Sequence, residues 1–164
     1  MKMRQNKQMI FSKFSSDEEL LRLLYYKPTN YNDSPLDPLK PNVLDLPEEE
    51  KWEIIDDLIK KTDKTDDLDE EPKCRILLYS GSRGNTDNYL LASQDIVFDI
   101  LVHINIYDVI DDRLDWICDK INELVSGKAI TGIGKSLFKN GGNIPAPKDY
   151  VGYRLVYNFG SGKE

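Results

Sequence analysis

A run of alternating apolar side chains over residues 95–107 constrains the fold of this chain more than any other feature. Its apolar positions recur at every second residue, whereas Asp99, His103 and Asn105 fall on the other face; the apolar set is Ile96, Phe98, Ile100, Val102, Ile104 and Ile106. A period of two over 13 residues, rich in β-branched side chains, is typical of a β-strand with one buried face. The run therefore predicts a long strand in a sheet.

The length of this strand predicts an assembly. At about 3.3 Å per residue the run spans roughly 43 Å, whereas a domain of about 90 residues is about 30 Å across. We therefore expect one end of the strand to project and to pair with a neighbouring subunit, because an uncovered apolar strand edge invites aggregation.

The elements around this strand predict an α+β core domain over residues 74–164. Residues 74–79 form a strand, and residues 108–126 have one apolar stripe at helical spacing, followed by Gly127 as the C-terminal cap. Further short strands are expected at 129–133 and 136–139, a turn at 140–143 and a terminal strand at 151–159. This order predicts a mostly antiparallel sheet with one main helix packed on a face.

The first 73 residues predict helical and extended segments outside that core. Residues 1–14 carry four basic side chains and no acidic one, without a clear period, so we expect a flexible basic arm. Residues 15–73 are expected to form an extension outside the core. It should contain a helix at 17–25, a proline-rich run at 29–47, a second helix at 47–59 and a solvated loop at 60–72.

Charge and composition narrow the function classes. Of the net charge of −7, residues 45–71 contribute −9, with 13 acids and 4 lysines, so a general DNA-binding surface is not expected. No apolar run is long enough to cross a bilayer, and the basic start has no secretory core, so we expect no membrane partner. Cys74 and Cys118 lack metal or disulfide spacing and are expected to be reduced core residues of a protein made in a cytoplasm.

The loop from Ser80 to Thr86 is the strongest candidate for ligand chemistry. A strand entering this Ser/Gly/Thr-rich segment, with Gly81 and Gly84, is similar to the phosphate-binding turn of flavodoxin-like proteins. That fold needs several further βα units, which this chain does not supply. A small flavin- or nucleotide-binding protein using this loop is therefore kept as the alternative function.

Other motifs favour structural roles over catalysis. Residues 129–136 almost match a phosphate-binding loop, but Ala129 replaces its first glycine and the flanking elements are wrong. His103 is expected to be a half-exposed strand residue, and Asp111, Asp112 and Asp115 to stabilise the start of a helix. We therefore predict no catalytic residue, no metal site and no cofactor, and a protein that is not an enzyme.

The core resembles the neck proteins of tailed bacteriophages, closest to the tail terminator or tail-completion group. The resemblance lies in the order of the elements and in their residue pattern, over residues 94–107, the helix at 108–126, residues 130–138 and residues 150–157. It implies a ring subunit of the virion, possibly in a hexamer, that joins the tail tube to the head connector. DNA would pass through the lumen without specific binding. A second alternative, a cellular interaction module with an acidic segment that binds a basic partner, stays open.

Overall fold

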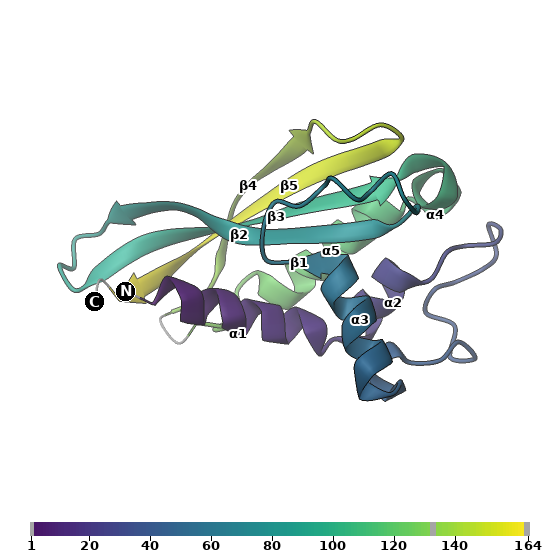
Figure 1. Ribbon diagram of the computed structural model, residues 1–164. Helices are drawn as coiled ribbons and strands as arrows, with labels where there is room; N and C mark the ends of the chain where they lie inside the picture. Colours follow the sequence, from purple (N-terminus) through teal and green to yellow (C-terminus); the bar gives the residue numbers. More distant parts are fainter. Residues whose placement is uncertain (1, 132–133, 163–164) are drawn as a thin grey trace.

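The computed structural model describes residues 2–131 and 134–162 and is built on one five-stranded sheet (Figure 1). The strands are β1 (Ile59–Lys60), β2 (Cys74–Asn85), β3 (Leu91–His103), β4 (Leu137–Ile144) and β5 (Tyr150–Gly162). Their order in the sheet is β1-β2-β3-β5-β4, and every neighbouring pair except β1 and β2 is antiparallel. The predicted α+β fold with a mostly antiparallel sheet is confirmed.

The long central strand is covered by the chain itself. β3 pairs with β5 over its whole length, from Leu91 opposite Gly162 to His103 opposite Tyr150, and its other edge pairs with β2. The expectation that this strand projects beyond its domain is therefore wrong. Its neighbours are longer than their apolar patterns indicated, because Ser80–Asn85 continues β2 despite its polar and glycine-rich composition.

The strand also begins and ends about four residues earlier than predicted. After His103 the backbone turns into a π-helical turn (Ile104–Asp108), in which His103 Nδ1 accepts a hydrogen bond from the Ile106 amide at 3.3 Å. The predicted helix 108–126 is interrupted at Asp112, where φ is 52°. It is therefore divided into α4 (Val109–Asp111) and α5 (Arg113–Val125), which carries the expected apolar stripe.

One face of the sheet is covered by helices, seen below the strands in Figure 1. They are α1 (Met3–Ser15), α2 (Glu18–Tyr25), α3 (Glu48–Leu58) and α5. The proline-rich run before α3 has no regular structure except a short 3-10 turn at Val43–Asp45, as its composition predicted. Side chains from all four helices and from β2, β3 and β5 share one hydrophobic cluster. The core therefore includes residues that the sequence placed in a separate extension.

The expectation of a flexible basic arm at residues 1–14 is also wrong. This segment forms α1, in which Ile10 and Phe14 are fully buried. The ring of Phe14 lies 5.1 Å from that of Phe98 on β3, and Asn6 donates a 3.2 Å hydrogen bond to Ser161 on β5. Because Asn6, Ile10 and Phe14 are four residues apart, they form one narrow stripe whose apolar part is only two residues.

The second face of the sheet is covered only at one end. There Leu68, from the segment expected to be a solvated loop, is buried against Leu77, Leu101 and Tyr150. Farther along β3 this face carries charged pairs. Arg154 donates to Asp99 at 2.7 and 2.9 Å, and Lys139 donates to Asp95 at 2.6 Å. Paired carboxylates therefore replace an apolar layer on the uncovered part of the face.

Residues 137–144 form an edge strand, which continues the strand predicted at 136–139 through the turn predicted at 140–143. The Asn140–Asn143 segment lies inside β4 and pairs with β5 from Val156 to Tyr153, after a bulge at Lys139. A Cβ on Gly141 would lie 3.1–3.3 Å from atoms of Tyr153, Arg154 and Leu155, so glycine allows this close approach. Residues 129–131 form no strand, and the remainder of the strand predicted at 129–133 lies outside the described residues.

Candidate assembly surface

The side of the sheet formed by β4 and α5 carries a hollow and an open strand edge. β4 pairs with β5 on one side only, so its outer backbone groups have no strand partner among the described residues. Leu137 and Phe138, at its start, are 60% and 53% exposed. Exposed apolar side chains beside an unpaired strand edge are typical of a contact surface.

The hollow lies between α5 and the strands β4 and β5 and has a volume of about 710 Å³. Its lining is apolar on the sheet side and polar on the helix side: Phe138, Tyr153 and Leu155 face Asp115, Cys118, Asp119, Asn122 and Ser126. The Phe138 ring packs edge-on against Tyr157, with the centroids 5.7 Å apart. We call this hollow together with the outer edge of β4 the β4 surface.

Two carboxylates set the electrostatics of the β4 surface. Asp115 and Asp119 are exposed one turn apart on α5, and neither forms an ion pair within the described part of the chain. Burial, together with these two carboxylates, raises the pKa of the half-buried Cys118 thiol to about 12. The thiol is therefore protonated at neutral pH and unsuited to nucleophilic or metal-binding chemistry.

In the interior, by contrast, two buried arginines are fully matched. Arg75 on β2 is fully buried, and its guanidinium donates to both carboxylate oxygens of Asp67 at 2.6 and 3.0 Å. It also binds Asp57 of α3 through the carboxylate at 2.9 Å and the carbonyl oxygen at 2.8 Å. Its hydrogen bonds to the Asp67 carboxylate, together with its positive charge, hold the pKa of Asp67 well below the usual range. Arg75 therefore attaches both α3 and the 61–73 segment to the sheet.

Arg113, the first residue of α5, attaches α2 in the same way. It is fully buried and pairs with Asp111 at 2.7 Å, and its Nη1 donates to the carbonyl oxygens of Leu23 and Tyr26 at 2.6 and 2.8 Å. Those carbonyls end α2, where a helix leaves its last acceptors unpaired. Its guanidinium also lies 5.2 Å from the centre of the Tyr107 ring.

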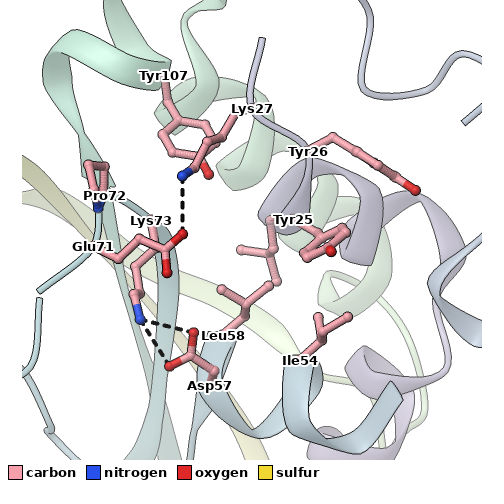
Figure 2. A pocket seen from close by; sticks show the side chains of 11 residues that line it. Tyr25, Tyr26, Lys27, Ile54, Asp57, Leu58, Glu71, Pro72, Lys73 and Tyr107 are labelled. Carbon is pink, nitrogen blue, oxygen red and sulfur yellow. Dashed lines mark hydrogen bonds and ion pairs between the residues drawn. The ribbon is translucent and has the colours of Figure 1, made fainter. Parts of the chain in front are cut away.

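A second hollow, of about 370 Å³, lies where α2, α3 and the start of β2 meet (Figure 2). Its walls include Tyr25, Ile54, Leu58 and Tyr107, and two ion pairs cross its rim. Lys27 pairs with Glu71 at 3.2 Å, and Lys73 with Asp57 at 2.9 Å. Both lysines are matched by carboxylates within the chain, so this hollow offers no unmatched cation to an anionic ligand.

The predicted flavin or nucleotide loop does not have the geometry of a phosphate-binding turn. Ser80–Asn85 belongs to β2 and pairs across a bulge with β3, and the turn follows at residues 86–90. A Cβ on Gly81 would lie 3.0 Å from atoms of Asp95 and Val97, so this glycine serves strand packing. No helix N-terminus follows the segment, as such a turn requires.

The other motifs have structural roles. His103 is half-exposed, as predicted, but it ends β3 instead of lying in mid-strand, and its ring stacks edge-on against Tyr150 at 5.2 Å. Cys74 is buried and Cys118 half-buried, both without a disulfide. The segment 129–136, which almost matches a phosphate-binding loop, includes residues 132 and 133, which lie outside the described residues. Within 2–131 and 134–162, no cluster of three metal-binding side chains occurs, and no helix is long and apolar enough to cross a membrane.

Sequence reasoning missed both the β4 surface and the buried arginines. A glycine- and asparagine-rich segment is ambiguous between a turn and an edge strand, and only its register with β5 resolves the choice. Arg75 and Arg113 lie beside apolar residues in the sequence, and that position was the one available signal. Their partners are 8 to 90 residues away, except Asp111.

Comparison with known proteins relates the chain to bacteriophages. The YomW family model matches residues 17–159, which is most of the chain. A curated relative, the SPbeta prophage-derived protein YomW of Bacillus subtilis (strain 168), is 32% identical over 163 residues and covers 94% of each chain. Its prophage origin makes this a phage-related protein. The chain belongs to the YomW family.

Proposed function

We propose that this protein is a non-enzymatic structural subunit of a phage virion, which forms a ring at the junction between head and tail. The observation that carries the proposal is the β4 surface, where an unpaired strand, two exposed apolar side chains and a hollow occur together. The prophage-encoded relative supports the phage context.

The β4 surface supports assembly because it remains incomplete in one copy of the chain. Backbone N–H and C=O groups on an open strand edge form hydrogen bonds with another chain when one is available. The bulge at Lys139 interrupts the regular β4 ladder, but the Lys139 side chain is directed to Asp95 across the sheet. It therefore does not place its charge over the outer edge, where lysine commonly blocks unwanted pairing.

The neck position rests on the resemblance of the core to tail terminator and tail-completion proteins. A ring at that position contacts a head connector and a tail tube and surrounds the DNA as it passes. The net charge of −7 suits such a conduit, because a wall without excess positive charge does not hold phosphates tightly.

A structural role also agrees with what the reactive side chains do. The pKa of the Cys74 thiol is raised by burial, and that of Cys118 by burial and nearby carboxylates. The His103 side chain accepts a hydrogen bond from the backbone after β3. These groups are engaged in packing and turns, so we propose no catalytic activity and no cofactor.

Deletion of the gene from an inducible phage tests the neck role. We expect DNA-filled heads and free tails that do not join, counted by electron microscopy, and joining restored when purified protein is added to the lysate. Normal virions in the deletion strain would contradict the proposal.

The flavin alternative has a separate readout. Adding FMN or a nucleotide to the purified protein is expected to leave its melting temperature unchanged, and a saturable increase would favour the alternative. Salt-sensitive capture of a basic cellular protein together with normal virions in the deletion strain would instead favour the interaction module.

A further inference from the structure

The side of the molecule opposite the β4 surface carries a cluster of basic side chains. Lys61 directly follows β1, the edge strand next to β2, and its amine lies 4.7 Å from the centre of the Phe11 ring on α1. Arg4 and Lys7 precede Phe11 on α1 by seven and four residues, so they lie on the same helix face. We call Arg4, Lys7 and Lys61 the basic cluster.

The charges of the basic cluster are not paired with carboxylates of the described residues. None of its three side chains takes part in an ion pair among the residues the structure describes, although 14 such contacts occur elsewhere. Burial, and repulsion by Lys61, lower the pKa of Lys7. Basic groups held near one another without a carboxylate are less favourable than the paired charges inside this protein, and a carboxylate from outside would relieve them.

The α5 side of the β4 surface has the opposite charge. Asp112, Asp115 and Asp119 are exposed at the start and along the outer face of α5, and none has an ion-pair partner in the described part of the chain. We call these three residues the acidic ridge. The nearby basic side chains of α5 do not neutralise it. Arg113 is fully buried against Asp111, and Lys120 pairs with Glu19 and Glu123.

The two clusters lie toward opposite edges of the sheet, on the face that the helices cover. α1 packs against β2, and Lys61 extends from the β1 edge, whereas α5 packs against β3 and β5 and borders the hollow beside β4. In Figure 1, α5 lies behind α1 and α3. Each copy therefore presents a basic side and an acidic side that differ from each other, which is the arrangement that joins copies head to tail.

We propose that the basic cluster of one copy binds the acidic ridge of the next copy, and that this contact brings the outer edge of β4 and its exposed Leu137 and Phe138 against the neighbour. The inference rests on the proposed ring and identifies its contact surfaces. Repetition of a head-to-tail contact closes into a ring when the rotation between copies permits it. The charges orient the copies, and the apolar side chains and the strand edge supply contact area.

A nucleic acid fits the basic cluster less well than a second copy does. Helix α3, which also packs against β2, presents Glu49, Glu50 and Glu53 to solvent. These carboxylates repel a long polyanion that follows the basic cluster. The acidic ridge of a second copy has only three carboxylates on one helix face. It can therefore contact the basic cluster without extending across α3.

Paired charge reversals test the contact. Variant A carries Asp115→Lys and Asp119→Lys, and variant B carries Arg4→Glu and Lys61→Glu; all four side chains are exposed and none forms an ion pair within the described residues. At low salt, light scattering is expected to show wild-type oligomers and at least about tenfold weaker association for either variant alone. Glu49→Lys with Glu50→Lys, a control with the same charge change as variant A, is expected to associate like wild type.

An equimolar mixture of variants A and B is the decisive arm. The reversed ridge of A complements the reversed cluster of B, and their unaltered sides also match, so association is expected to return to the wild-type level in the mixture. Failure of the mixture to associate, or a monomeric wild type at high concentration and low salt, would overturn the proposed contact. If the wild type is monomeric in solution but is still found at the neck of purified virions, the proposed contact fails and the proposed function stands.

Discussion

The charged side chains of two regions differ in pairing: the buried arginines of the interior have partners, whereas the aspartates that α5 contributes to the β4 surface have none within the described residues. Arg75 and Arg113 are fully buried, and each is matched by carboxylates and carbonyl oxygens of its own chain. Asp115 and Asp119 are exposed, and no ion pair to either is formed by the described residues. Matched buried charges connect the N-terminal helices to the sheet, whereas the unmatched exposed charges are available to another molecule. Substitutions in the two regions should therefore separate stability from assembly.

Replacement of Arg113 is expected to have the largest effect on stability. Arg113→Ala leaves Asp111 and the last carbonyl groups of α2 without their donor, at a cost of about 3–5 kcal/mol in the free energy of unfolding. Urea unfolding followed by circular dichroism measures the loss. Arg4→Ala, an exposed arginine, serves as the control and should stay within about 0.5 kcal/mol of wild type. Equal stability of the two variants would remove the distinction between the regions.

Two aspartates sharpen the comparison at a smaller scale. Asp67→Asn removes one carboxylate from the buried Arg75 and is expected to cost about 1.5–3 kcal/mol, the range for hydrogen bonds to charged groups. Asp115→Asn makes the same chemical change at the β4 surface and should leave the unfolding free energy nearly unchanged. A larger loss for Asp115→Asn than for Asp67→Asn would reverse the assignment of the two regions.

Acid titration gives a further contrast. Because Arg75 depresses the folded-state pKa of Asp67, this residue contributes stability above its unfolded pKa of about 3.9. That contribution is lost as the pH falls below about 4 toward the depressed folded value. Unfolding free energies measured between pH 7 and pH 3 should therefore fall less steeply for Asp67→Asn than for wild type. Parallel curves for the two proteins would contradict this coupling.

The smallest expected effect on folding comes from the edge of β4. Leu137→Ser removes an exposed apolar side chain and should change the unfolding free energy by no more than about 0.5 kcal/mol. Its oligomers, measured by light scattering, should be weaker than those of wild type. Leu39→Ser, at a leucine that is 90% exposed elsewhere, should alter neither quantity. Weaker association in both variants would indicate a general effect of apolar surface.

Strong periodic patterns made most of the sheet and the main helix predictable. The strand ending at His103, the terminal strand and the apolar stripe of α5 all follow such patterns. α1 was missed because its buried stripe has only two apolar residues, Ile10 and Phe14, within a mostly polar segment. The lengths of β2 and β4 depend on hydrogen bonds to strands far along the chain, which glycine, serine and asparagine do not indicate.

The candidate site was less predictable than the fold. The sequence led to an assembly surface at an uncovered long strand, but β2 and β5 cover that strand, and the open edge is β4. The acidic side chains Asp112 and Asp115 were interpreted as helix-stabilising residues, which their positions at the start of α5 allow. Their isolation from counter-charges appears only when the surrounding side chains are in place.

Cross-linking between copies tests the central claim most directly. Carbodiimide, which joins an amine to a carboxylate without a spacer, would be applied to a mixture of ¹⁴N- and ¹⁵N-labelled protein and the peptides identified by mass spectrometry. We predict links from Lys7 or Lys61 to Asp115 or Asp119 that combine the two isotopes. Isotopically mixed links confined to other surfaces, with none between these residues, would contradict the account.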